Sequence, residues 1–395
     1  MNTASNSTRI YSPVEIVFCK DAVSKTGSVC KNYGKNALIA TMQSLIDIDL
    51  LNNLLASLKR AKINCVIFSK VNSEPTCEEI DAAGKILKKS KIDLIIGVGG
   101  GSCMDFAKAL AILANHPKDV WSYVDLSNKP PDKIDPKKVL PVITIPTSSG
   151  TGSEVTPFAV AKNTKTVQKG TIKNHAIFPK VTIIDPKLTT SVPKNLTASI
   201  GVDALSHMLE NYFNVERRNP YSDALVEEGL KRIIKYLPIA YRNGENLQAR
   251  TEVAWASALA GIANANAGTT VVHALSHPAG ARLQIPHGIS VAMFLVAVMK
   301  KTIYLEYDRA SRISQIFGLH SRNLTRGRLA ENIINFLDEV LTSINMTPKL
   351  SEYSQDRKYI EIIVDDALSY MSRPIKQHVK VFTRKELENI VNDSF

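Results

Sequence analysis

Two spacings of apolar residues divide the chain into halves. In the first half, short runs rich in β-branched residues alternate with stretches of amphipathic helical pattern. The runs are "NALIAT" (36–41), "NCVIFSKV" (64–71), "IDLIIGVGGG" (92–101), "LPVITIPTS" (140–148) and "VTIIDP" (181–186). Strands that alternate with helices are typical of a parallel, doubly wound sheet, which binds ligands at the carboxyl ends of its strands. The first half is therefore predicted to be an α/β domain.

The second half shows a helical pattern. From about Leu188 onward apolar residues recur every three or four positions, as in "PYSDALVEEGLKRIIKYL" (220–237), and strand-like runs disappear. A chain of 395 residues is too long for one typical core. Pro186 and Pro193 bracket polar residues that suit the start of a helix. We predict an α/β domain over residues 1–188 and an all-α domain over residues 189–395.

Composition narrows the class of protein. With 44% hydrophobic and 22% charged residues, the chain has the composition of a soluble globular protein. The formal net charge is +12, which suits a generic basic surface or the steering of a phosphorylated cofactor. Because the basic residues are scattered and aromatic residues make up only 6%, we expect no nucleic-acid partner.

The sequence also bears on location. The longest apolar run, residues 289–299, is too short to cross a bilayer, so no membrane partner is expected. The N-terminal residues lack the pattern of a secretory signal, and the five cysteines form no CxxC pair. Free thiols in a reducing compartment fit this pattern, and we expect a cytoplasmic protein.

A glycine-rich turn follows the third apolar run. In "DLIIGVGGGSCMDFAKAL" (93–110) an apolar strand runs into consecutive glycines and then into an amphipathic helix. Glycine lets the backbone approach an anion, and a helix N-terminus offers free N–H groups. Ser102 and Asp105 have the spacing of a capping box, which places the helix start at the glycines. The turn, with Gly97, Gly99, Gly100 and Gly101, therefore predicts a phosphate-binding site. A tight connection without a ligand is the alternative, because Ser102 replaces the last glycine of GxGxxG.

A loop rich in hydroxyl groups follows the fourth run. In "IPTSSGTGSEVTPF" (145–158), hydroxyls and free amides can hydrogen-bond phosphate, ribose or carboxamide groups. For this segment alone, a polar loop that merely ends a strand is the alternative. Two such loops after two strands of one sheet favour a nucleotide-binding crevice.

Histidines cluster in the second half. Asp203 and His207 lie four residues apart in a helical pattern, His273 and His277 repeat that spacing, and His287 follows Pro286. A lone histidine in a helix is usually a core residue, but four of them with a carboxylate in register favour a metal site. Imidazole and carboxylate suit Fe²⁺, Zn²⁺ or Mn²⁺. The spacing does not distinguish which three of the four histidines would bind the ion.

The chain resembles the iron-containing, or group III, metal-dependent alcohol dehydrogenases. The blocks that carry the resemblance are "GVGGGS..D..KA", "IPTSSGTGSEVTPFAV", "GVDALSHMLE" and "HALSHPAGARLQIPHG". They appear in the family's order and spacing, and the resemblance covers nearly the whole chain. The second block is especially similar to the alcohol dehydrogenase module of bifunctional aldehyde–alcohol dehydrogenases.

The resemblance implies a fold and a reaction. The fold is that of dehydroquinate synthase: a Rossmann-like, nucleotide-binding parallel-sheet domain followed by a helical metal-binding domain. The reaction is hydride transfer between a small primary alcohol or aldehyde and nicotinamide C4 of NAD(H) or NADP(H). The substrate oxygen would lie on a divalent metal, with Fe²⁺ as the first choice. A homodimer is expected because relatives dimerise.

The resemblance also assigns residues. It implies metal ligation by Asp203, His207, His273 and His287, and it makes His277 a proton-relay group near the nicotinamide and the substrate. The glycine turn would hold the pyrophosphate with Asp105 beside it, and Thr147, Ser148 and Thr151 would line the nicotinamide side. Lys169 would contact the cofactor, with a solvated surface lysine as the alternative.

Three positions depart from the family pattern, and a fourth residue, Arg282, lies between the last two of the implied ligands. Met42 stands where many NAD-using members have an Asp that binds the ribose 2′-hydroxyl, so we expect NADP(H) to be tolerated or preferred. Asn264 and Phe158 are expected to reshape the substrate pocket. Arg282 is expected either to meet an anionic substrate or, more simply, to support the site from behind or lie at the surface.

Two other functions remain open. A metal-dependent lyase of the dehydroquinate synthase type shares the fold, but it has Glu where this chain has Asp203. A non-catalytic relative is the other, although the complete set of candidate ligands argues against it.

Overall fold

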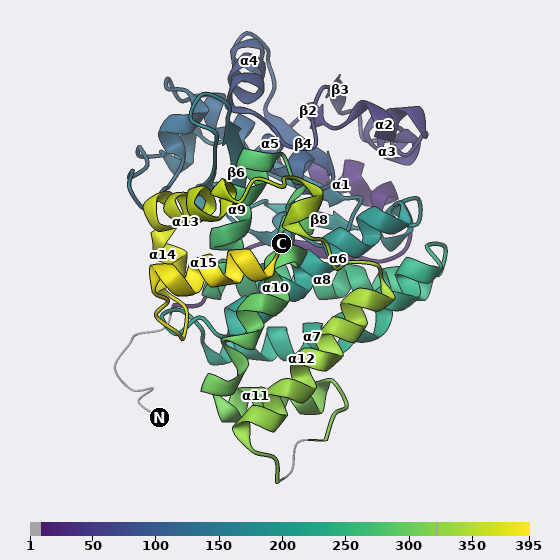
Figure 1. The fold of residues 1–395 in the computed structure, drawn as a ribbon. Coiled ribbons are helices and arrows are strands. Elements are labelled where there is room, and N and C mark those ends of the chain that lie inside the picture. The colour runs from purple at the N-terminus through teal and green to yellow at the C-terminus, as the bar shows by residue number, and fades with distance from the viewer. Residues whose placement is uncertain (1–8, 321–322) are drawn as a thin grey trace.

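The protein is described by a computed structural model that covers residues 9–320 and 323–395. Six strands of the N-terminal half form one parallel sheet, in the order β1-β8-β5-β4-β2-β3 (Figure 1). The strands are β1 (Glu15–Phe18), β2 (Asn36–Ala40), β3 (Asn64–Phe68), β4 (Leu94–Gly99), β5 (Val142–Pro146) and β8 (Val181–Ile184). Each predicted apolar run contains one of these strands, which confirms the parallel sheet.

Helices pack on both faces of the sheet. They are α1 (Thr26–Cys30), α2 (Gln43–Asp47), α3 (Asn52–Arg60), α4 (Cys77–Leu87) and α5 (Gly101–Leu113). Alternate residues of β4 enter different cores: Ile95 packs in the cluster that includes residues of α4 and α5, whereas Ile96 and Val98 pack in the cluster that includes α3. Since both faces are buried, the strand sequences are continuously apolar.

Strands β1, β6 and β7 were not among the predicted elements. Strand β1 has only four residues, lies at the edge of the sheet and is partly exposed. Strands β6 (Phe158–Asn163) and β7 (Gln168–Lys173) form an antiparallel hairpin. In β6 buried and half-buried positions alternate, so the apolar signal is spread over small residues such as Ala159 and Ala161.

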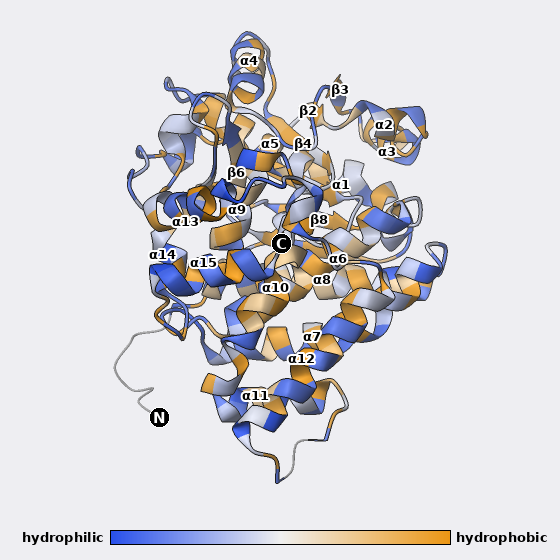
Figure 2. Ribbon diagram, viewed as in Figure 1, coloured by the Kyte–Doolittle hydropathy of each residue, from blue (hydrophilic) through white to orange (hydrophobic). Residues whose placement is uncertain are grey.

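The second half is helical, and with the parallel sheet it confirms the predicted fold class. Its helices enclose a separate apolar core. They are α6 (Lys194–Tyr212), α7 (Pro220–Arg242), α8 (Leu247–Ala267), α9 (Val271–Leu283), α10 (His287–Lys300), α11 (Tyr307–Ile316), α12 (Arg326–Ser343), α13 (Lys358–Tyr370), α14 (Ser372–Lys376) and α15 (Arg384–Asp393). Figure 2 shows α10 as predominantly hydrophobic near the centre, whereas α12 and α15 alternate hydrophilic and hydrophobic residues.

Helix α10 continues into a longer apolar stretch than the sequence pattern indicated. Residues 287–305 have the length and mean hydropathy, 1.6, of a membrane span, and 56% of the most apolar window is buried inside the protein. Phe294, Leu295 and Val298 belong to the helical core. A buried core helix meets the same criteria, so this stretch is only weak evidence for a membrane segment.

Candidate metal centre and cofactor cleft

One carboxylate lies at the centre of the histidine cluster. Asp203 and His207 project from the same face of α6, and the Oδ1 atom of Asp203 lies 3.7 Å from Nε2 of His207. The same oxygen lies 3.4 Å from Nε2 of His273 on α9 and 3.5 Å from Nε2 of His287, the first residue of α10. Three helices thus direct three imidazole nitrogens at one carboxylate oxygen.

The atoms of this cluster suit a divalent cation. One ligand atom from each of Asp203, His273 and His287 lies within 4.8 Å of the other two. Among the described residues, Asp203 Oδ1, His207 Nδ1 and His273 Nε2 are buried without a hydrogen-bond partner. Buried polar atoms are rarely left unpaired. The donor set therefore fits a metal such as Fe²⁺, Zn²⁺ or Mn²⁺.

Charge and burial favour the ligand forms of Asp203 and His207. Burial alone would raise the pKa of Asp203, but the neighbouring His207, His287 and His273 hold it well below its usual value. Burial lowers the pKa of His207 below its ordinary value. The carboxylate is consequently ionised and His207 neutral near pH 7, as ligation requires.

Glu210 supports His273 from behind. Its carboxylate is fully buried on α6 and contacts Nδ1 of His273 through Oε2. The Oε1 atom accepts hydrogen bonds from the backbone N–H of Thr270 at 2.8 Å and from that of His273 at 3.3 Å. Burial opposes protonation of His273, but Glu210 and Asp203 raise its pKa to about 10. A carboxylate on the far nitrogen of a metal-binding histidine fixes the orientation of the ring.

The sequence interpretation missed Glu210. It is the last residue of the "GVDALSHMLE" block, three residues after His207 and seven after Asp203. That spacing puts it on the same helix face as both residues, and this signal could have identified it.

His277 differs from the other three histidines. Its ring centroid lies 6.2 Å from that of His273 and 5.6 Å from that of His287. Its Nδ1 atom is buried and has no hydrogen-bond partner among the described residues. Burial, followed by the charges of His287 and His273, lowers its pKa well below the ordinary value. His277 is thus a neutral imidazole beside the ligand cluster.

The glycine turn lies at the carboxyl end of β4. Gly99 has φ of +144°, and a Cβ there would lie 2.5 Å from Sγ of Cys103, so a larger residue would not fit. Helix α5 begins at Gly101, as predicted, but its N-cap is Gly100 and no side chain caps it. Ser102 instead donates a hydrogen bond to the carbonyl of Ser73 in the loop after β3.

Asp105 is directed toward the β6–β7 hairpin. Its carboxylate accepts hydrogen bonds from Oγ of Ser153 and from the backbone N–H of Val160, the latter at 2.9 Å. Lys108, fully buried one turn further along α5, lies 3.5 Å from Asp105 and donates to Ser153 at 2.6 Å. The capping box expected between Ser102 and Asp105 is therefore wrong, because Asp105 joins α5 to the hydroxyl loop and the hairpin.

The hydroxyl loop packs directly on the glycine turn. The backbone N–H of Thr147 donates to the carbonyl of Gly99 at 2.9 Å. A Cβ placed on Gly100 would lie 3.2 Å from Oγ of Ser148, and one on Gly101 would lie 2.7 Å from Cγ2 of Thr151. The structure thus brings together the glycine turn and the three hydroxyl residues that the sequence singled out.

Two further predicted residues lie at this edge of the sheet. Met42 is the N-cap of α2, immediately after Thr41 at the end of β2, and forms an isolated β-bridge with Lys70. Lys169 on β7 is only 4% exposed, and its ammonium pairs with the carboxylate of Glu74. The buried position of Lys169 excludes the alternative of a solvated surface lysine.

Comparison with known proteins follows the same division of the chain. Residues 13–186 match the family model for iron-containing alcohol dehydrogenase, and residues 197–395 match the model for the C-terminal part of the Fe-containing alcohol dehydrogenase family. The chain belongs to the iron-containing alcohol dehydrogenase family. It is accordingly an enzyme, an oxidoreductase of this family.

Relatives cover most of this alcohol dehydrogenase. Long-chain-alcohol dehydrogenase 1 of Geobacillus thermodenitrificans (strain NG80-2) is 35% identical over 85% of this chain and 83% of its own length. The 1,3-propanediol dehydrogenase of Citrobacter freundii is 33% identical over 85% of this chain and 86% of its own. The bifunctional aldehyde-alcohol dehydrogenase of Escherichia coli (strain K12) is 31% identical over 80% of this chain but only 38% of its own length.

Solved structures share the whole architecture. An archaeal halo-thermophilic Red Sea brine pool alcohol dehydrogenase superposes with a TM-score of 0.93 at 29% identity, covering 98% of this chain and 99% of that one. Sulfoacetaldehyde reductase from Bifidobacterium kashiwanohense, solved in complex with NAD⁺, gives 0.87 at 25% identity, covering 99% of each chain.

The structure also shows the contacts of Arg282, Asn264 and Phe158, the three residues expected to bear on substrate choice. Arg282 forms a two-point ion pair with Asp366 on α13, with nitrogen–oxygen distances of 2.7 and 3.1 Å. It therefore joins α9 to α13, which agrees with the simpler, supporting interpretation and not with a free anion-binding group. Asn264 is buried on α8, and the carbonyl of Phe158 accepts a hydrogen bond from Lys108.

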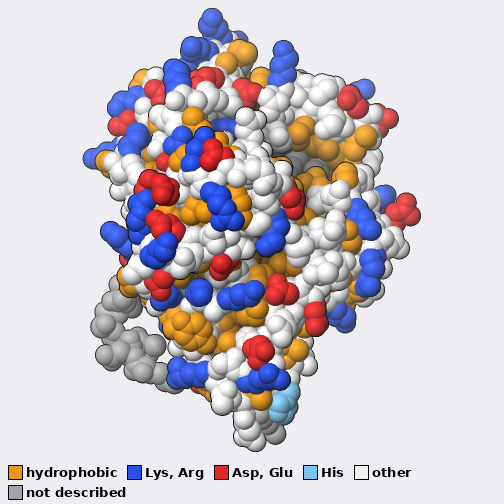
Figure 3. Space-filling view, viewed as in Figure 1, with side chains coloured by type: hydrophobic (Ala, Val, Ile, Leu, Met, Phe, Trp, Pro, Cys, Tyr) orange, Lys and Arg blue, Asp and Glu red, His pale blue; other side chains and the backbone are white. Residues whose placement is uncertain are grey.

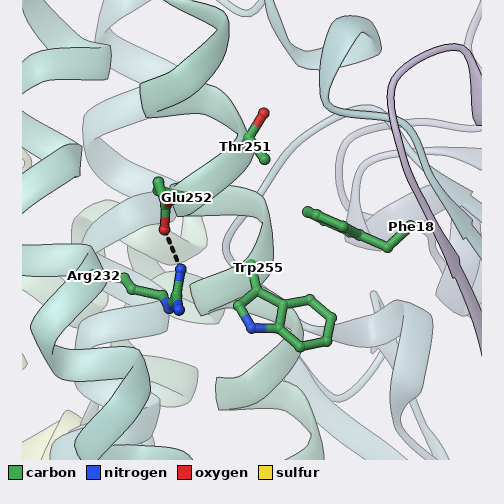
Figure 4. A pocket seen from close by; sticks show the side chains of 5 residues that line it. All are labelled: Phe18, Arg232, Thr251, Glu252 and Trp255. Carbon is green, nitrogen blue, oxygen red and sulfur yellow. Dashed lines mark hydrogen bonds and ion pairs between the residues drawn. The ribbon is translucent and has the colours of Figure 1, made fainter.

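A hollow of about 260 Å³ lies elsewhere on this alcohol dehydrogenase (Figure 4). Its walls come from β1, α7 and α8, and it is lined by Phe18, Arg232, Thr251, Glu252 and Trp255. The side chains of Arg232 and Glu252 pair across one side, while the rings of Phe18 and Trp255 contact each other at a tilt, with centroids 5.1 Å apart. None of these residues belongs to the metal or cofactor groups.

Proposed function

We propose that this protein is a metal-dependent, NAD(P)-linked alcohol dehydrogenase or aldehyde reductase acting on small primary alcohols and aldehydes. One observation carries the proposal: three imidazole nitrogens lie 3.4–3.7 Å from one ionised carboxylate oxygen, in a chain that belongs to the iron-containing alcohol dehydrogenase family. The reaction would be hydride transfer between the alcohol carbon and nicotinamide C4.

The metal would be held by four residues. Asp203, His207, His273 and His287 are the proposed ligands, with Fe²⁺ as the first choice and Zn²⁺ or Mn²⁺ as alternatives. When bound, a divalent ion supplies a Lewis acid that polarises the substrate oxygen. Glu210 would hold the Nδ1 side of His273, so that Nε2 points toward Asp203.

His277 is the proposed catalytic residue. Its neutral imidazole lies beside the ligand nitrogens rather than among them, and its pKa is held low by burial. A neutral ring nitrogen can take up a proton from the substrate hydroxyl and release it toward solvent. This role is consistent with the unpaired Nδ1 atom of the ring.

The cofactor would lie across the carboxyl ends of the strands. We propose that Gly99, Gly100, Gly101 and Ser102 hold the pyrophosphate at the start of α5, near Asp105, and that Thr147, Ser148, Thr151 and Lys169 line the nicotinamide side. Relatives support nicotinamide cofactors: one is an NAD-dependent methanol dehydrogenase of Bacillus methanolicus. Because Met42 puts no carboxylate at the end of β2, we propose that NADP(H) is tolerated or preferred.

Organisation and location are also proposals. We infer domains over residues 1–188 and 189–395, a homodimer and a cytoplasmic location; the free cysteines are consistent with the last of these. On the visible face Lys and Arg side chains are interspersed with Asp and Glu rather than gathered in a stripe (Figure 3). Light scattering after size exclusion tests the dimer directly.

One panel of assays tests the function. Protein reconstituted separately with Fe²⁺, Zn²⁺ and Mn²⁺ is offered a series of aldehydes and alcohols with NAD(H) and with NADP(H). We expect a net change in nicotinamide absorbance for at least one small primary aldehyde. A lyase of the dehydroquinate synthase type would regenerate its NAD and show no net change, and a metal-free protein with no turnover would point to a non-catalytic relative.

A further inference from the structure

The loop between β3 and α4, residues 69–76, contacts three parts of the proposed cofactor cleft. The backbone N–H of Val71 donates to the carbonyl of Thr41 at the end of β2, at 3.2 Å. The carbonyl of Ser73 accepts from Ser102 in the glycine turn. The carbonyl of Pro75 accepts from the backbone N–H of Lys162 in the hairpin, at 3.0 Å. Glu74 is therefore fixed between two anchored neighbours.

The side chain of Glu74 pairs with two lysines of the β6–β7 hairpin. Its Oε1 atom pairs with the ammonium of Lys169, and its Oε2 atom lies 3.7 Å from the ammonium of Lys162. Lys169 in turn reaches α9, because a Cβ placed on Gly280 would lie only 2.9 Å from its Nζ atom. Gly280 lies three residues after His277, so Lys169 connects Glu74 to the helix that carries His273 and His277.

The order of these groups matches the order of parts in a dinucleotide. Ser102 lies at the proposed pyrophosphate turn, Glu74 and Lys169 come next, and His277 lies beside the proposed metal ligands. In NAD(P), a ribose joins the pyrophosphate to the nicotinamide ring. A ribose offers a pair of hydroxyl donors, and a carboxylate offers about four acceptor positions, which the two lysines do not exhaust.

The carboxylate of Glu74 is partly exposed, whereas its lysine partner is enclosed. The Glu74 side chain is 26% exposed, whereas Lys169 is almost fully enclosed. Burial lowers the pKa of Lys169, and the neighbouring carboxylate of Glu74 opposes that shift. An enclosed ammonium without such a partner would be unfavourable.

We propose that Glu74 is a cofactor-binding residue that accepts hydrogen bonds from the hydroxyls of the nicotinamide ribose, with Lys169 held beside it as the complementary donor. The inference rests on the proposed function, since it requires a nicotinamide cofactor in this cleft. It adds a residue that neither the sequence pattern nor the family resemblance assigned.

The experiment measures binding by titration calorimetry on metal-reconstituted protein. The probes are NADH or NADPH, whichever wild type binds more tightly, together with ADP-ribose and ADP. The reduced cofactor and ADP-ribose carry the second ribose, whereas ADP does not. For Glu74→Gln we expect the Kd of the reduced cofactor and of ADP-ribose to rise at least about tenfold, as for the loss of a hydrogen bond to a charged group. The Kd of ADP should stay within about twofold.

A matched control removes a neighbouring carboxylate. Glu78 lies four residues away and bonds the Thr164 hydroxyl at 2.9 Å, so Glu78→Gln makes the same change of charge outside the cleft. It should bind all probes as wild type does. Unchanged or tighter binding of reduced cofactor and ADP-ribose by Glu74→Gln would overturn the proposal, as would equal weakening of ADP.

A second comparison tests whether the two residues act together. In the Lys169→Met background, adding Glu74→Gln should weaken cofactor binding by less than it does in wild type, because the residues form one unit. If the two substitutions weaken cofactor binding by fully additive amounts, the proposal that Glu74 and Lys169 act together is overturned. If wild type binds neither NADH nor NADPH, the proposed function itself fails; if wild type binds and Glu74→Gln binds equally, only this inference fails.

Discussion

The proposed metal centre and the proposed cofactor cleft are built in opposite ways. The proposed metal centre uses side chains from α6, α9 and α10 that are directed at one oxygen of Asp203; all are buried except that of His287, which is partly exposed. The cofactor cleft uses strand ends, loops and backbone groups, with side-chain contacts such as Lys169 to Glu74 across 95 positions of sequence. Helices fix ligand geometry before the ion arrives, whereas loops at strand ends let the backbone reach a long ligand.

The largest expected effect comes from breaking the metal centre. His273→Ala removes an imidazole whose Nε2 lies 3.4 Å from Asp203 and leaves Glu210 buried without its histidine partner. The variant should lose its metal, and kcat should fall by about three orders of magnitude or more, since several kcal/mol of Lewis-acid stabilisation are lost. Elemental analysis of purified protein, alongside steady-state kinetics, gives both values.

His277→Ala tests the difference between a proposed metal ligand and a proposed proton relay on the same helix, α9. His277 lies one turn beyond His273, so the two variants are matched for helix, residue type and burial. We expect His277→Ala to retain its metal while kcat falls about 10²-fold, the scale of a lost proton relay. A metal-free His277→Ala protein would show that His277 is a ligand and that one of the other histidines is not.

At the proposed metal centre, the sequence could predict which residues share a helix face. Residues four apart on a helix share a face, so Asp203 with His207 and His273 with His277 were visible as pairs. Spacing alone made the four histidines equivalent, because it does not say how α6, α9 and α10 cross. The family resemblance gave His277 a separate role, and the packed helices place its ring apart from the three rings that approach Asp203.

The cofactor cleft was predictable only where a local signal exists. The glycine turn after β4 and the hydroxyl loop after β5 follow apolar runs, so both were recognised. Glu74 has no local signal: its partner Lys169 lies on β7, a strand that contains only one large apolar residue, Ile172, and was itself missed. The edge strand β1 was missed for a similar reason, because partial exposure weakens its apolar pattern.

A smaller effect on metal affinity is expected when Glu210, which contacts the proposed ligand His273, is changed. Glu210→Gln places an amide where Oε2 now contacts Nδ1 of His273, which disturbs the tautomer and orientation of the ring. Metal affinity should fall about 10- to 100-fold, the usual cost of losing such a partner. Competition with a chelator measures it. Glu228→Gln, a half-exposed carboxylate paired with Arg232 on α7, is the control and should leave metal affinity unchanged. Equal metal affinity in both variants would contradict a supporting role for Glu210.

The smallest expected effect concerns the cofactor cleft. It changes the preference for NADPH over NADH and leaves the activity itself largely intact. Met42→Asp places a carboxylate at the end of β2, where it can bond a ribose 2′-hydroxyl and repel a 2′-phosphate. Asp is favoured at a helix N-cap, and Met42 occupies that position in α2 without a capping bond, so the helix should tolerate the change.

We expect the ratio of kcat/KM for NADPH to that for NADH to fall about tenfold in Met42→Asp, corresponding to roughly 1.4 kcal/mol. Ser44→Asp adds the same charge two residues later on an exposed position and is the matched control. A strong preference of the wild type for NADH, or an equal change in both variants, would show that Met42 does not set cofactor choice. The metal content of Met42→Asp should equal that of wild type, because the two regions are built from separate elements.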